Sequence, residues 1–85
     1  MAKATSPVRD LATRGAYRDS CRMIRLGWGV RPIVNQLRLD YPRDHLDTIK
    51  AVVQLASESC AAAALLRGLG PGETLADSDI PRLPE

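Results

Sequence analysis

The fold of this chain is decided by residues 44–68, whose sequence is DHLDTIKAVVQLASESCAAAALLRG. Apolar side chains recur in it at steps of three and four residues, which places them on one face of an α-helix. Asp44 is predicted to cap this helix, Asp47 to stabilise the same N-terminus, and Gly68 to end it. The predicted core face consists of Ile49, Val52, Val53, Ala56, Cys60, Ala63 and Leu66.

The same helix carries apolar residues outside one narrow stripe. Its alanine run, residues 61–64, allows a neighbouring helix to approach closely. An excess of apolar surface on a small domain indicates self-association or a partner protein. The residues that spread across this wider surface are Val52, Leu55, Ala62, Leu65 and Leu66.

A first helix is predicted upstream of Gly27. Ser6 is expected to cap it and Pro7 to occupy its first turn, where the missing N–H does no harm. Gly15 is expected to break or bend the helix, and Gly27 to end it. Its apolar face is formed by Tyr17, Cys21 and Ile24.

A second, shorter helix follows, with Pro32 in its first turn. It ends at Tyr41 because the residue before a proline, here Pro42, disfavours helical geometry. Its buried face is predicted to be Ile33, Val34 and Leu37.

Together these segments predict an all-α fold with one small three-helix domain, residues 7–67. The core must be aliphatic, since the 85 residues include no Phe, one Trp and two Tyr. Residues 1–6 are predicted to be a flexible N-terminus. Residues 68–85 are predicted to be a flexible, acidic tail rich in Pro and Gly. The only apolar anchors of this tail are Leu75, Ile80 and Leu83.

Charge is distributed unevenly along the chain. Residues 1–43 contain nine basic and three acidic residues, a net charge of +6, whereas residues 44–85 have a net charge of −4. Two interpretations are open. The basic half binds an acidic partner or a phosphate backbone, or the two halves neutralise each other within the fold or between copies.

Cys21 and Cys60 lie on the apolar faces of the first and third helices. Their thiols share a core layer if those two helices are neighbours. A disulfide between them would close a loop of about 40 residues and stabilise the fold by roughly 4 kcal/mol. The alternative is a pair of reduced, buried cysteines that act as small hydrophobic residues. Spacing alone does not decide between the two.

Gly15 precedes Cys21, and Gly27 follows that cysteine by six residues. This order of residues resembles that of a large mycobacterial family of small, mostly secreted helical proteins of unknown function. The resemblance covers residues 15–60 and implies that Cys21 and Cys60 pair in a disulfide. It implies no enzymatic activity. The family's aliphatic positions, its break and its last helix fall at Ile33, Leu37, Tyr41, Pro42, Ile49, Val52, Val53, Ala56 and Cys60.

The chain departs from that family in two ways. Ser59-Cys60-Ala61 stands in place of the family's Tyr-Cys-Pro ending. Residues 1–20 contain charged residues throughout and therefore do not have the pattern of a secretory leader. The chain is therefore predicted to be cytoplasmic, where disulfides are normally reduced. The alternative is a secreted protein whose leader is not included in this sequence. A relative of the family that is encoded by a phage would fit both departures. No membrane-spanning segment is expected.

An enzyme or metal protein is not predicted. His45 is the only histidine and is expected on an exposed first turn. Two cysteines with one histidine are too few for a structural zinc site. The glycine-rich segment after Gly68 lacks the Lys-Ser or Lys-Thr of a phosphate-binding loop. No cofactor is expected.

The predicted function is a non-enzymatic protein-interaction module, which also accommodates self-association. Its predicted partner-binding residues are Trp28, Arg22, Arg25 and Arg31. Trp28 lies between two glycines, where the ring either caps the core or projects outward.

The alternative is a small nucleic-acid-binding regulator with a helix-turn-helix outline. In that hypothesis Arg31, Arg38 and Arg43 contact phosphates, and Asn35 or Gln36 lies near the base edges.

Overall fold

The N-terminal part of the chain forms one bent helical arm in the computed structural model, which describes residues 6–70 and 73–83. The arm consists of α1 (Pro7–Leu11), the π-helical turn η1 (Ala12–Ala16) and α2 (Tyr17–Arg25). Ser6 caps α1 as predicted, since its hydroxyl accepts a hydrogen bond from the backbone N–H of Arg9 at 3.1 Å. The arm bends at Gly15, whose φ of 120° is one that L side chains rarely adopt. The predicted break near Gly15 is therefore confirmed.

Two more helices complete the fold. The short turn at residues 26–29 leads into α3 (Val30–Asp40), which ends at Tyr41 as predicted. The longest helix, α4 (Leu46–Arg67), ends at Gly68 in the left-handed conformation that favours glycine. Helices account for every long element in the described part of the chain, so the all-α, three-helix prediction is confirmed.

The prediction that Asp44 caps α4 was wrong. His45 occupies the cap position, and no side chain there hydrogen-bonds the first turn. The carboxylate of Asp44 is held instead by Arg14, with Nη2–Oδ1 at 2.6 Å and Nη1–Oδ2 at 3.2 Å. A bidentate guanidinium contact of this kind is stronger than a neutral capping bond and ties the bent arm to the start of α4.

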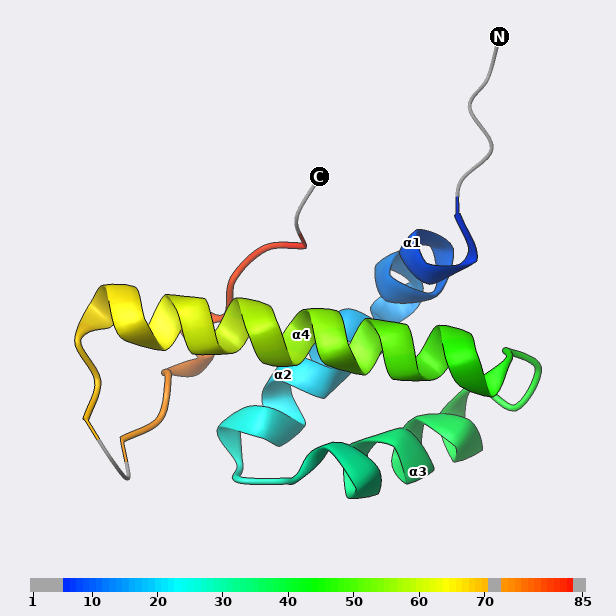
Figure 1. Ribbon diagram of the computed structural model, residues 1–85, viewed down its shortest axis with the longest axis horizontal. Coiled ribbons are helices and arrows are strands. Elements are labelled where there is room, and N and C mark those ends of the chain that lie inside the picture. Colours follow the sequence, from blue (N-terminus) through cyan, green and yellow to red (C-terminus); the bar gives the residue numbers. More distant parts are fainter. Residues whose placement is uncertain (1–5, 71–72, 84–85) are drawn as a thin grey trace, which may run out of the picture.

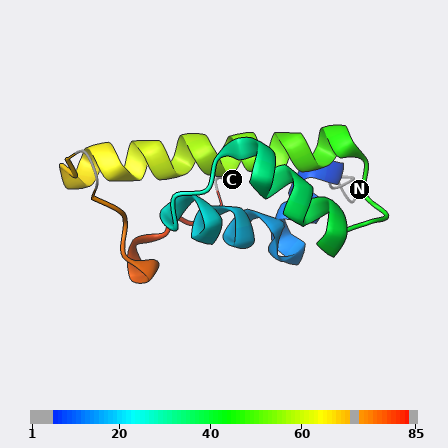
Figure 2. The same ribbon diagram turned by 90° about the horizontal axis from the view of Figure 1, so that it is seen from below.

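The helices form two layers. α4 lies across one side of the molecule, and the bent arm and α3 lie against its other side (Figures 1 and 2). α3 and α4 run in opposite directions because only the short loop at residues 41–45 joins them (Figure 1). The last turns of α4 extend past α2 and α3 (yellow in Figure 1).

The core lies between the two layers and is almost entirely aliphatic. α4 contributes most of it, and the predicted faces of the other helices meet it. Leu66 was predicted on the core face but is 90% exposed, because it lies on the part of α4 that extends beyond the bundle. Val52 is fully buried, which confirms its place on the predicted core face; it does not belong to the wider apolar surface on which it was also counted. The buried apolar residues are Leu11, Ala12, Ala16, Tyr17, Cys21, Ile33, Val34, Leu37, Ile49, Val52, Val53, Ala56, Cys60 and Leu75.

The structure describes residues 68–70 and 73–83 of the predicted tail, residues 68–85. Of the predicted flexible N-terminus, residues 1–6, it describes only Ser6. The tail contains one short 3₁₀ turn, η2 (Asp77–Asp79). All three of its predicted anchors pack against the core, Leu75 as a buried residue and Ile80 and Leu83 as half-buried ones.

Polar contacts also fasten this segment to the helices. The carbonyl of Leu75 accepts a hydrogen bond from Arg25 Nε at 2.8 Å, and the carbonyl of Arg82 accepts one from Tyr17 Oη at 3.3 Å. Asp79 forms an ion pair with Arg67 near the end of α4. The segment therefore lies along α2 and the last turns of α4.

Candidate functional site

Cys21 and Cys60 lie against each other in the core, one on α2 and one on α4. The prediction that their thiols share a core layer is confirmed. Both thiols are free, so the disulfide implied by the family resemblance is not formed in this structure. Burial, together with the neighbouring Cys60 thiol, raises the pKa of Cys21 to about 12. A thiol of this kind is neutral at ordinary pH and is a poor nucleophile.

A pocket of about 260 Å³ opens beside the two thiols. Its walls are mainly apolar, and the C-terminal segment closes one side with Leu75 and Ile80. The polar groups at its edge are Arg25, Ser57, Glu73 and Thr74. Arg25 is already occupied by the carbonyl of Leu75. The neutral Cys21 thiol is therefore not an activated nucleophile.

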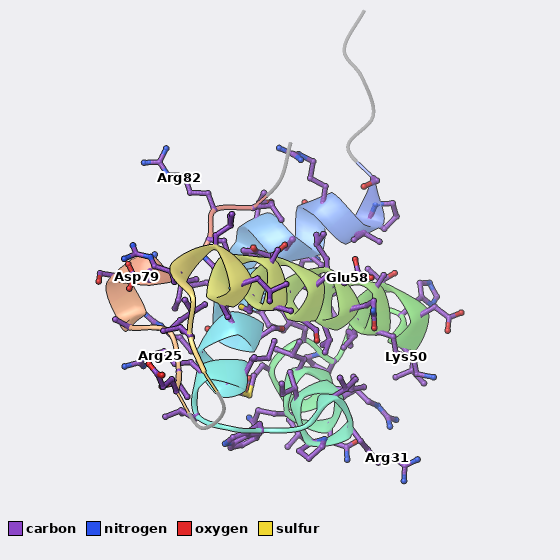
Figure 3. All side chains as sticks on the ribbon, turned by 60° about the vertical axis from the view of Figure 1, so that its left-hand side comes forward. Arg25, Arg31, Lys50, Glu58, Asp79 and Arg82 are labelled. Atoms are coloured by element: carbon purple, nitrogen blue, oxygen red, sulfur yellow. The ribbon has the colours of Figure 1, made fainter. Side chains whose placement is uncertain are left out.

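The predicted partner-binding residues do not form one site. Arg25 faces the C-terminal segment, whereas Arg31 lines a different surface, between α3 and α4 (Figure 3). Arg22 is exposed on α2 and makes its own contact within the chain. Trp28 is 42% exposed and is not among the residues that pack in or against the core, so it does not cap the core.

Trp28 belongs to a small apolar surface at the turn between α2 and α3. We call it the turn patch, formed by Leu26, Trp28 and Val30, all of which are exposed. A second surface, the α4 end patch, is formed by Ala61, Ala62, Leu65 and Leu66. Leu65 is 81% exposed, so neither leucine of this patch contributes appreciably to the core.

A groove of about 560 Å³ runs between α3 and α4. Two helical stripes form its walls, with residues spaced by about one turn on each helix. The α3 wall consists of Val30, Arg31, Val34, Asn35 and Arg38, and the α4 wall of Leu46, Lys50 and Gln54. We call this surface the basic groove. Arg31 and Lys50 point to the same side of the molecule in Figure 3.

The electrostatic character of the basic groove follows from its lining. Three cations line it, and none of the lining residues is a carboxylate. In the part of the chain that the structure describes, Arg31, Arg38 and Lys50 form no ion pair. The amide of Gln54 is held by Glu58 at 3.0 Å, one turn further along α4. The lining of the groove is therefore positively charged.

Sequence reasoning identified only part of this groove. The nucleic-acid hypothesis named Arg31, Asn35 and Arg38, which the structure brings together. Gln36, its alternative to Asn35, is directed to Asp40 instead, at 3.3 Å. The contribution of α4 was missed, although its signal was present as the four-residue spacing of Leu46, Lys50 and Gln54. Arg43 is exposed in the loop between α3 and α4 and does not line the groove.

Metal ligands and the apolar composition of α4 bear on two other kinds of site. No group of three or more His, Cys, Asp or Glu residues that could hold a metal ion occurs among residues 6–70 and 73–83. His45 is exposed at the start of α4, as predicted. By length and composition alone, α4 is apolar enough to cross a membrane, yet one face of it forms the core of the bundle.

Comparison with known proteins gives no relative. No family model, no curated protein and no solved structure matches this chain. The resemblance to the mycobacterial family therefore stays a prediction.

Proposed function

We propose that this chain is a non-enzymatic protein-interaction module. The observation that supports it is the set of large apolar side chains left uncovered on so small a domain. Most of them gather in the turn patch and the α4 end patch, and two, Val30 and Leu46, line the basic groove. They are Leu26, Trp28, Val30, Leu39, Leu46, Leu65 and Leu66.

The test is selection of binding peptides from a random library on the immobilised full chain, with sedimentation of the free chain beside it. Peptides enriched over a bare surface, or a concentration-dependent dimer, support the proposal. Trp28→Ala and Leu65→Ser should weaken whichever interaction uses their patch. Leu39→Ser is the matched control because Leu39 is exposed but lies in neither patch. A chain that selects no peptide and stays a monomer refutes the proposal.

A nucleic-acid-binding regulator is the second candidate. It is supported by the four-residue turn between α2 and α3, which suits a helix-turn-helix, and by the exposed Arg31, Asn35 and Arg38 that follow on α3. Its test is a salt titration of binding to random-sequence duplex DNA. Three phosphate contacts would give a slope of about −2.7 in log K against log salt. Weak binding without a salt dependence refutes it.

The disulfide is a separate proposal about the same chain. Because the Cys21 and Cys60 thiols are neighbours across the core, a disulfide oxidant such as oxidised glutathione can join them. One thiolate attacks the glutathione disulfide, and the second thiolate displaces the bound glutathione. The two cysteines are oxidised and two molecules of glutathione leave reduced. Intact mass lower by two hydrogens supports this proposal, and a stable mixed disulfide on wild-type protein refutes it.

A further inference from the structure

We propose that the basic groove binds an acidic, amphipathic helical segment of a partner protein. This inference rests on the proposed function and names the chemistry of its partner.

The spacing of the cations in the basic groove supports an acidic helical partner. Arg31 and Arg38 are seven residues apart on α3, which is two helical turns or about 10 Å. Lys50 lies on the opposite wall, on α4. A helix laid along the groove presents carboxylates at the same repeat when its acidic residues are three, four or seven apart. Guanidinium groups match such carboxylates with paired hydrogen bonds.

The apolar side chains of the basic groove indicate that the partner helix is amphipathic. Val30 is 47% exposed and Leu46 is 39% exposed, although both lie among the cations. Val34, which is 7% exposed, also lines the groove. An amphipathic helix covers these side chains with its own apolar stripe while its acidic flank reaches the cations.

Nucleic acid fits the same groove less well. A phosphate backbone satisfies Arg31, Arg38 and Lys50, but it offers no apolar surface to cover Val30 and Leu46. Those side chains would stay exposed or would meet charged phosphate oxygens. The combination of a cationic rim with apolar walls therefore favours a protein segment.

The test uses peptides selected on the full chain, each resynthesised with a fluorescent label. Selected peptides should carry Asp or Glu at helical spacing beside an apolar stripe. Arg38→Glu should weaken their binding about tenfold or more, through loss of one attraction and gain of one repulsion. Arg18→Glu makes the same charge change beside the C-terminal segment and should leave binding within about twofold. Circular dichroism verifies that both variants are folded.

A charge swap makes the test specific. A peptide whose acidic residue is replaced by Arg should bind Arg38→Glu better than it binds the wild-type chain. Selected peptides that are neutral or basic, or that bind Arg38→Glu as well as Arg18→Glu, overturn the inference. If Trp28→Ala abolishes the binding of those peptides instead, the proposed function as an interaction module is retained, and only the assignment of the binding site to the basic groove is wrong.

The remaining outcomes also decide. Duplex DNA that displaces the peptides, binds more tightly than they do and depends on Arg38 would make the groove a nucleic-acid site and overturn the inference. Selection of no peptide at all, with a chain that stays monomeric, overturns the inference and the proposed function together.

Discussion

Replacement of Gly15 by alanine tests the bend on which the whole arrangement of the arm depends. Gly15 has φ 120° and ψ −12° in the middle of η1, where an L side chain is strained. A Cβ atom built there would lie 3.1 Å from the hydroxyl oxygen of Tyr41. That hydroxyl donates a hydrogen bond to Asp19 Oδ2 at 3.4 Å, so it is not free to move away without loss.

The magnitude follows from these two effects. Backbone strain at such a position costs about 1–3 kcal/mol. The crowded hydroxyl adds about 1 kcal/mol if its hydrogen bond to Asp19 is lost. The lower entropy of an unfolded chain with alanine offsets about 0.4–1 kcal/mol. Gly15→Ala should therefore lower the free energy of unfolding by about 2 kcal/mol, measured by urea denaturation with circular dichroism.

Two further variants separate the causes. Tyr41→Phe in the Gly15→Ala background removes the crowded oxygen, so it should recover the contact part of the loss and leave the backbone part. Gly29→Ala is the matched control because Gly29 has φ −75° and a Cβ there would meet only Pro32 Cδ at 3.8 Å. That control should change the stability by less than about 0.5 kcal/mol. Equal stabilities for Gly15→Ala and Gly29→Ala would refute the bent arm.

Four other predictions follow from burial and charge. Leu37→Ala should lower the free energy of unfolding by about 2–5 kcal/mol because Leu37 is fully buried. Leu65→Ala should lower it by less than about 0.5 kcal/mol because Leu65 is exposed. Equal losses of stability in urea denaturation would contradict this packing. Asp44→Asn should cost about 1 kcal/mol or less, and less still in high salt, because its partner Arg14 is exposed. Iodoacetamide should alkylate Cys21 at pH 8 about a thousandfold more slowly than a free peptide thiol, because a pKa of about 12 leaves little of the thiol as thiolate. Peptide mapping measures the rate, and fast labelling of the folded protein would contradict this prediction. The free energy of unfolding should also fall as pH rises from the ordinary thiol pKa to about 12, by up to about 1.4 kcal/mol per pH unit. The reason is that the unfolded chain releases the Cys21 proton in this range, whereas the folded chain retains it. Cys21→Ala should remove that slope.

The sequence predicted the helices well because their signals are local. Ser6 and Gly68 act within one turn of the helix ends they mark, and the periodic faces of α3 and α4 match their buried residues. Asp44 failed as a cap because its actual partner, Arg14, is 30 residues away. Leu66 failed as a core residue because periodicity gives the face of a helix and not how far the neighbouring helices extend along it.

The candidate site was less predictable for the same reason. Arg25 and Arg31 are only six residues apart, yet the turn between α2 and α3 sends them to different surfaces. Lys50 and Leu46 join Arg31 only because α4 runs back along α3. No local pattern states which stripe of one helix faces which stripe of the other. The groove therefore required the tertiary structure.

The projecting end of α4 is the feature that folding explains least. Its last turns add backbone hydrogen bonds, and Arg67 there holds Asp79 of the C-terminal segment. Neither contribution requires leucine at positions 65 and 66, whose side chains are almost fully exposed. Polar residues of equal helix propensity would serve the helix as well and would reduce aggregation. The proposed contact with another molecule would explain these leucines, and the turn patch and the apolar walls of the basic groove support the same proposal.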